Sequence, residues 1–191
     1  MNKKIILNIA GANVSGKTTF APYLHHIYDK EDSVKPDIIA AGLSLHPQTV
    51  AFQSGRLALK RIKKLINLNK SFAYETTLAS HTVEHIMKSC DRRLFRINLH
   101  FLALPSIVSA RNRVRLRVEQ GGHDIPDSVI ERRFKRGLNN FFSVYKHQVD
   151  EWVLYDALST QEIIAYQSGS EPKTVLLPEK LATLESLYDQ Y

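Results

Sequence analysis

Short apolar runs, rich in β-branched residues and bounded by polar turns, recur along the chain and predict the strands of a sheet. Runs of this length and composition are typical of strands buried on both faces. They predict core strands at residues 4–10, 71–76, 94–104, 152–158 and 162–167. Residues 174–177 extend this set or pair at an edge, and residues 34–37 predict a short extended segment.

Between these runs, apolar residues recur with helical spacing. The spacing predicts helices at residues 18–29, 47–69, 81–90, 126–147 and 181–187. Residues 111–118 alternate strictly, which fits a strand, but a helix from Pro105 also fits because Ala110 and Val114 then share a face. The helix is favoured because no turn signal precedes Gly121.

This alternation of strands and helices predicts an α/β fold, with three layers around a mostly parallel, doubly wound sheet. At 191 residues, one domain over residues 1–191 is the expectation. No apolar run approaches the roughly 20 residues that a membrane span needs. In such sheets ligands bind at the carboxyl ends of the strands, so the chemistry is sought there.

The segment after the first strand matches the phosphate-binding pattern G-x-x-x-x-G-K-[ST] at every fixed position. A predicted strand precedes it and a predicted helix follows, which is the context that a phosphate-binding loop requires. Glycines let the backbone amides converge on a polyphosphate, and the helix N-terminus adds partial positive charge. We expect nucleotide contacts from Gly11, Ala12, Asn13, Val14, Ser15, Gly16, Lys17, Thr18 and Thr19.

Within this loop, two side chains have predicted chemical roles. Lys17 reaches the β- and γ-phosphates, and the Thr18 hydroxyl ligates Mg²⁺. The loop therefore predicts binding of ATP or GTP with Mg²⁺.

Two carboxylates follow predicted strands at the same edge of the sheet. Asp37 has the place of an acceptor-site carboxylate in a small-molecule kinase, or it caps the turn that follows. Glu75 ends a core strand, where it binds metal or substrate hydroxyls, or is only a solvated strand end. The strand at 94–104 ends without a Walker B acid, which argues against motor proteins and GTP switches.

The formal net charge of the whole chain is +7, and the positive charge is concentrated in its second half. Two basic helical segments flank Gly121–Gly122 and predict a helical lid over residues 105–147, with arginines that grip phosphate oxygens. The alternatives are a solvated basic face or a nucleic-acid patch. Nucleic-acid binding is disfavoured because the nearby phenylalanines have the spacing of a helix core. The candidate lid arginines are Arg113, Arg117, Arg132, Arg133 and Arg136.

The remaining composition favours a cytoplasmic protein. The single cysteine, Cys90, excludes an intrachain disulfide, and no cysteine–histidine spacing suggests zinc. The N-terminal apolar run contains Asn8 and ends at Gly11, so a signal peptide is not expected.

Several separated motifs, in order along residues 3–156, resemble the zeta-toxin family of P-loop kinases. They include Pro36-Asp37-Ile38-Ile39-Ala40, Phe72-Ala73-Tyr74-Glu75-Thr76-Thr77-Leu78, and Gly121-Gly122-His123-Asp124-Ile125-Pro126. Ala51-x-x-x-Gly55-Arg56 and Ile130-x-Arg132-Arg133-Phe134 are also similar. Lys35 stands where the family often has asparagine.

The resemblance implies a kinase that uses ATP and Mg²⁺ to phosphorylate a hydroxyl. In the family's toxins the acceptor is the 3′-hydroxyl of the sugar in UDP-N-acetylglucosamine, and an antitoxin-like protein partner is implied. Another metabolite or nucleotide is the alternative acceptor. Carried over by position, Asp37 is the general base, and Arg117 with Arg132 or Arg133 are lid arginines. The implied acceptor-site residues are Glu75, Thr77, Arg56 and Arg113.

Overall fold

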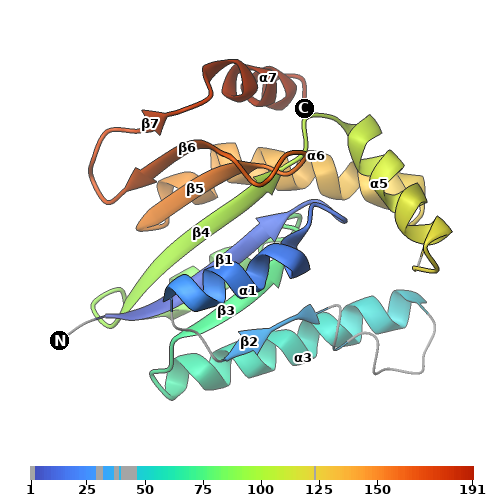
Figure 1. Cartoon of the computed structure of the whole chain (residues 1–191). Helices are drawn as coiled ribbons and strands as arrows, with labels where there is room; N and C mark the ends of the chain where they lie inside the picture. The colour runs from blue at the N-terminus through green and yellow to red at the C-terminus, as the bar shows by residue number, and fades with distance from the viewer. Residues whose placement is uncertain (1–2, 29–31, 37–38, 40–46, 123) are drawn as a thin grey trace.

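The structure, a computed structural model, describes residues 3–28, 32–36, 39, 47–122 and 124–191. It has one seven-stranded sheet in the order β2-β3-β1-β4-β5-β6-β7 (Figure 1). The first five strands in this order are parallel. Strand β6 pairs antiparallel with β5, and β7 pairs antiparallel with β6. The strands are β1 Lys4–Gly11, β2 Ser33–Val34, β3 Phe72–Thr76, β4 Phe95–Ala103, β5 Glu151–Asp156, β6 Ile163–Ser168 and β7 Thr174–Val175.

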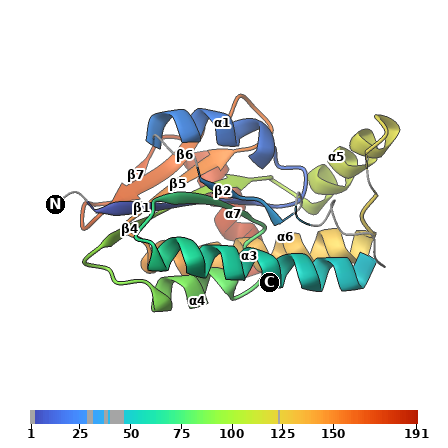
Figure 2. The ribbon, with the colours of Figure 1, turned by 90° about the horizontal axis from the view of Figure 1, so that it is seen from below.

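Helices cover both faces of the sheet, which gives three layers (Figure 2). Helix α1 lies on one face, and α3, α4 and α6 lie on the other. Helix α5 packs on α6, while α7 packs on α6 and β6. The helices are α1 Lys17–Tyr28, α3 Pro47–Asn67, α4 Thr82–Ser89, α5 Ile107–Glu119, α6 Asp127–Ser143 and α7 Pro178–Asp189, with a 3₁₀ turn at Tyr145–His147.

The central strands are buried on both faces, as their nearly continuous apolar sequences predicted. Ile6, Leu7 and Ile9 of β1 are completely buried, because β1 lies between β3 and β4 and has helices on both sides. The register pairs Ala10 with Thr76 and Gly11 with Leu102. The carboxyl ends of β1, β3 and β4 therefore meet at one edge, which fixes the positions of the loops that follow them.

The ambiguous segment 111–118 is helical and belongs to α5. Two glycines end this helix: Gly121 has a left-handed φ of +82°, and the Gly122 amide donates to the Arg117 carbonyl at 2.8 Å. The Gly121 amide also donates to the Val118 carbonyl at 2.9 Å, which completes a Schellman cap. This pattern is local to the sequence and explains why the helix prediction holds.

The α/β class and the mostly parallel sheet are confirmed, and two helix boundaries differ from the prediction by three residues or more. The helix predicted for 126–147 ends at Ser143, and a separate 3₁₀ turn follows. The last helix begins at Pro178 instead of residue 181, because proline at the first helical position needs no amide hydrogen bond. Among the described helices, none has the length and apolar character to cross a membrane.

Candidate active site

The loop between β1 and α1 has the backbone conformation of a tight glycine loop. Gly11 and Gly16 have φ of +148° and +91°, and Val14 has φ of 56°. A Cβ atom on Gly11 would lie 2.5 Å from the Leu102 carbonyl oxygen and 2.6 Å from Ser15 Oγ. Only glycine therefore fits at position 11, where the loop passes close to the end of β4.

Lys17 begins α1, and its side chain folds back over the loop. Its Nζ donates to the carbonyl oxygens of Gly11 at 2.9 Å and Ala12 at 2.8 Å, and the residue is 9% exposed. These carbonyls hold the ammonium on the concave side of the loop. A lysine in this place meets phosphate as a compact positive charge.

Thr18 follows Lys17 and contacts the buried carboxylate at the end of β3. Its hydroxyl donates to Glu75 Oε2 at 3.1 Å, across 57 residues of sequence. The other oxygen, Glu75 Oε1, lies 2.9 Å from Lys35 Nζ in an ion pair that lacks hydrogen-bond alignment. One carboxylate thus joins the predicted metal ligand to a lysine at the end of β2.

This arrangement fits a magnesium ion held together with a nucleotide. Mg²⁺ sites of this kind use one or two protein oxygens, with phosphates and water supplying the others. Thr18 offers an exposed hydroxyl, and Glu75 offers a nearby carboxylate. The described residues contain no cluster of three or more acidic, histidine or cysteine side chains for an all-protein metal site.

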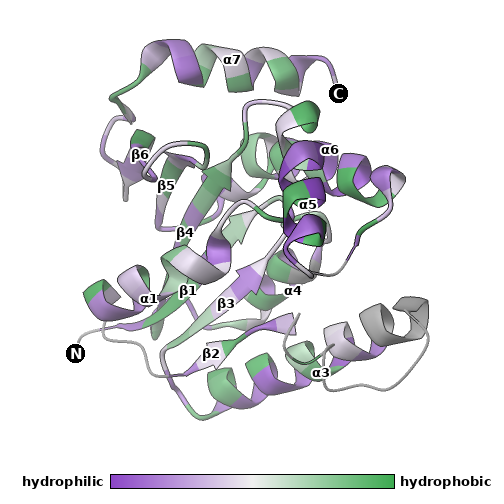
Figure 3. Cartoon of the chain, turned by 45° about the vertical axis from the view of Figure 1, so that its right-hand side comes forward, coloured by the Kyte–Doolittle hydropathy of each residue, from purple (hydrophilic) through white to green (hydrophobic). Residues whose placement is uncertain are grey.

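Two arginines reach the loop, one each from α5 and α6. Arg113 Nη1 donates to the Val14 carbonyl at 3.2 Å, and Arg133 Nη1 donates to Asn13 Oδ1 at 3.2 Å. Figure 3 shows α5 beside α6, with hydrophilic and hydrophobic residues mixed along it. With Lys17, these side chains place three positive charges around the loop, which favours a polyphosphate ligand.

The other predicted lid arginines lie farther out. Arg117, Arg132 and Arg136 are exposed. The arginine hydrogen bonds to the loop described above come from Arg113 and Arg133. The alternation within the basic segments did not distinguish the arginines that face the loop from those that face solvent.

Helix α6 also fixes the segment that follows β3, which contains the predicted acceptor residue Thr77. A Cβ on Gly137 would lie 2.6 Å from the Thr77 carbonyl oxygen, so glycine permits a close approach of helix and loop. Asn140 Nδ2 donates to the Leu78 carbonyl at 2.7 Å, and the Tyr145 hydroxyl donates to the Ser80 carbonyl at 3.0 Å. The segment that follows β3 and helix α6 therefore form one packed unit.

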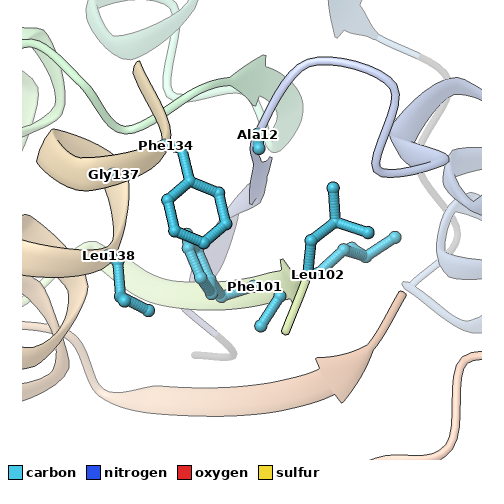
Figure 4. A pocket seen from close by; sticks show the side chains of 8 residues that line it. Ala12, Phe101, Leu102, Phe134, Gly137 and Leu138 are labelled. Atoms are coloured by element: carbon cyan, nitrogen blue, oxygen red, sulfur yellow. The ribbon is translucent and has the colours of Figure 1, made fainter. Parts of the chain in front are cut away.

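A small apolar cavity lies beneath the phosphate loop (Figure 4). Its volume is about 10 Å³, at the lower limit for one water molecule. Ala12 of the loop, Phe101 of β4 and Phe134 of α6 contribute to its lining. The buried phenylalanine confirms that the aromatic positions of α6 belong to the core, which leaves them unavailable for stacking on nucleic-acid bases.

The remaining predicted residues divide into two groups. Asp37 and His123 lie outside the described residues, so the structure gives no position for the predicted base. Arg56 on α3 and Thr19 on α1 are exposed, and Thr77 is half-buried. The roles of these residues stay predictions.

A buried polar chain under α1 was missed by sequence reasoning. His100 Nδ1 lies 2.9 Å from the Tyr155 hydroxyl, and His100 Nε2 lies 3.0 Å from the Tyr28 hydroxyl, which donates to Glu151 Oε1 at 2.9 Å. Burial lowers the pKa of His100 to about 4. Burial and then the Glu151 charge raise the pKa of Tyr28 to about 12. The available signal was a histidine in the otherwise apolar second half of β4.

The direction of these hydrogen bonds is set by the Glu151 carboxylate, which can only accept. The Glu151 carboxylate accepts from Tyr28, so the Tyr28 oxygen accepts from His100 Nε2–H, and Nδ1 accepts from Tyr155. Every member is satisfied when His100 is neutral.

No family model matches the chain. Among curated proteins, an uncharacterized protein of Haemophilus influenzae is 23% identical over 129 residues, covering 65% of this chain and 88% of that protein. Among solved structures, the AvrRxo1-ORF1:-ORF2 complex with ATP has a TM-score of 0.74 at 16% identity. That alignment covers 97% of this chain, which spans only 64% of the length of that chain.

Two further structures align over nearly the whole chain. A structure of the PezAT chromosomal toxin-antitoxin system of Streptococcus pneumoniae has a TM-score of 0.61 at 12% identity, covering 100% of this chain and 88% of that one. A sugar kinase from Janibacter has a TM-score of 0.53 at 13% identity, with coverages of 99% and 92%. At these identities the likeness concerns the fold alone: the chain shares the α/β fold of these solved structures, one of which is a sugar kinase, and this agrees with the fold class that its alternating strands and helices predicted.

Proposed function

We propose that the chain is a phosphotransferase that uses ATP and Mg²⁺ to phosphorylate a hydroxyl of a small molecule. The observation that carries the proposal is the contact between Thr18 and Glu75 beside a glycine loop covered by Lys17. It brings the glycine loop, the hydroxyl that we propose binds the metal and a carboxylate to one edge of the sheet. Kinases and an ATP complex with this fold support the reaction class.

On the nucleotide side, residues 11–19 hold the triphosphate. Lys17 exchanges its carbonyl partners for phosphate oxygens, while Arg113 and Arg133 stabilise charge that spreads over the transferring group. Thr18 and Glu75 are the residues that hold Mg²⁺. Bound Mg²⁺ neutralises charge on the phosphates.

On the acceptor side, Asp37 accepts the proton of the attacking hydroxyl. The alcohol oxygen forms a bond to the γ-phosphorus, the bond from that phosphorus to the bridging oxygen breaks, and ADP leaves with the bonding pair. Thr77 and Arg56 bind the acceptor. Arg117 completes the lid when it closes.

The motif resemblance names UDP-N-acetylglucosamine as the first acceptor to test, and another metabolite or nucleotide as the alternative. An antitoxin-like protein is the proposed partner, since two of the similar structures are of a toxin–antitoxin system and a two-protein complex. Because the reaction consumes ATP, we place it in the cytoplasm.

The test is incubation with labelled ATP and a panel of UDP-sugars, nucleotides and sugar acids, with mass spectrometry of the products. We expect one class of acceptor to gain a single phosphoryl group. Lys17→Ala is the control and is expected to give no product. If no acceptor gains phosphate, or if Lys17→Ala is as active as the wild type, the proposal is wrong.

A further inference from the structure

Lys35 gives the candidate metal site a positive charge of its own. It follows β2 directly, and β2 pairs with β3 so that Val34 lies opposite Tyr74. This register places Lys35 beside Glu75, with 2.9 Å between Nζ and Oε1. The two side chains are 22% and 9% exposed, so the pair is largely shielded from water.

The same carboxylate is engaged on its other side by the Thr18 hydroxyl at 3.1 Å. Within the described residues, the recorded carboxylate contact of Thr18 is with Glu75, and β4 ends in Leu102 and Ala103 instead of an acid. A divalent ion bound at Thr18 would therefore share Glu75 with the Lys35 ammonium. Two cations that share one carboxylate repel one another, and the low exposure of the pair weakens the screening of that repulsion by water and salt.

We propose that Lys35 is a resident counter-ion of Glu75 that competes with Mg²⁺, so that its removal tightens Mg²⁺-dependent nucleotide binding. Lys35 neutralises the buried carboxylate when the nucleotide is absent, and it opposes the divalent ion when the nucleotide binds. The inference rests on the proposed function, because it assumes that Thr18 and Glu75 hold the metal.

The opposite role for Lys35 would give the opposite result. A lysine that only held Glu75 in position would be needed for metal binding, and its loss would weaken that binding. The direction of the change therefore distinguishes competition from positioning.

The experiment measures ATP binding by calorimetry at a series of Mg²⁺ concentrations, with no acceptor present. For Lys35→Met, which removes the charge and keeps most of the side-chain length, we expect the half-saturating Mg²⁺ concentration to fall about fivefold. Lys35→Gln repeats the loss of charge, and Lys35→Arg keeps the charge and should resemble the wild type. Lys63→Met removes the same charge from an exposed position on α3 and should change nothing.

A Glu75→Gln background tests whether the effect passes through the carboxylate. There, Lys35→Met should shift the half-saturating concentration by less than about twofold, because the ammonium is no longer held at the site. Thermal unfolding confirms that each variant is folded. An unchanged or raised Mg²⁺ requirement in folded Lys35→Met or Lys35→Gln overturns the inference alone. A wild-type chain without Mg²⁺-dependent ATP binding overturns the proposed function as well.

Discussion

Val14 shows at the residue scale how the phosphate loop departs from ordinary backbone preferences. A β-branched residue with φ of 56° is a rare conformation that costs on the order of 1–3 kcal/mol. The loop holds it between Gly11 and Gly16, and the carbonyl of Val14 receives Arg113. The strained residue therefore lies where the lid helix touches the loop, at the site for which we propose function.

His100 makes the stability of the fold depend on pH. Its pKa of about 4 in the folded state is below the ordinary value near 6.5, so the unfolded chain takes up the proton first as pH falls. The contribution of neutral His100 to the free energy of unfolding is fully present above about pH 6.5, and it is lost as the pH falls from there towards 4. The loss attributable to His100 at pH 5 is about 2 kcal/mol.

Urea unfolding of the wild type and of His100→Asn at pH 7 and pH 5 measures the contribution of His100 to the pH dependence of stability. The variant should be less stable at pH 7, because it breaks the chain from Tyr155 to Glu151, yet it should lose less stability between the two pH values. His26→Asn, at an exposed position on α1, is the matched control. Equal pH dependence in His100→Asn and the wild type would show that His100 is not the group responsible.

At the scale of the element, α6 links the acceptor side to the nucleotide side. Gly137 and Asn140 hold the loop after β3, while Arg133 on the same helix contacts Asn13 of the phosphate loop. A shift of this helix would therefore move both the segment after β3 and the side chain that contacts the phosphate loop.

Gly137→Ala tests the close approach of α6 to Thr77. The added Cβ would meet the Thr77 carbonyl oxygen at 2.6 Å, and backbone must move to relieve the clash. We expect a loss of about 1–3 kcal/mol in the free energy of unfolding, although alanine is the better helix former. Gly55→Ala in α3 is the control: among the described residues its Cβ meets no atom within 4 Å, so a gain of about 0.5–1 kcal/mol is expected. Equal effects of the two substitutions would remove the argument for a tight contact.

Arg133 and Arg132 are adjacent on α6 but should differ in function. Arg133 contacts the loop and Arg132 is exposed. Arg133→Met should lower kcat/KM for phosphoryl transfer by about 10²-fold, as expected for loss of a charge on the transferring group. Arg132→Met should lower it by much less. Steady-state kinetics on an acceptor found by product analysis compares them, and a larger loss for Arg132→Met would contradict the assigned geometry.

At the scale of the whole molecule, the fold was predictable because its signals are local. Apolar strand runs, the glycine loop and the Gly121–Gly122 cap each lie within a few residues of sequence, and parallel topology brings Glu75 to Thr18. The sequence could not predict that Arg133, and not the adjacent arginine, contacts the phosphate loop. Its partner lies 120 residues away, and both arginines have the same local sequence pattern.

The ion pair of Lys35 with Glu75 was also missed. It depends on a two-residue strand pairing with β3, and a strand that short leaves almost no periodicity to detect. Side-chain contacts between distant segments are set by packing of the whole sheet, which no window of sequence encodes.

The account as a whole depends on a triphosphate binding to the loop between β1 and α1. Calorimetric titration of ATP into the wild type and into Lys17→Ala, both in the presence of Mg²⁺, tests this most directly. We predict one ATP per chain for the wild type and an affinity at least about 10²-fold weaker for Lys17→Ala, which loses the charge held over the loop. A wild-type chain that does not bind ATP, or a folded Lys17→Ala chain that binds it equally well, would contradict the account.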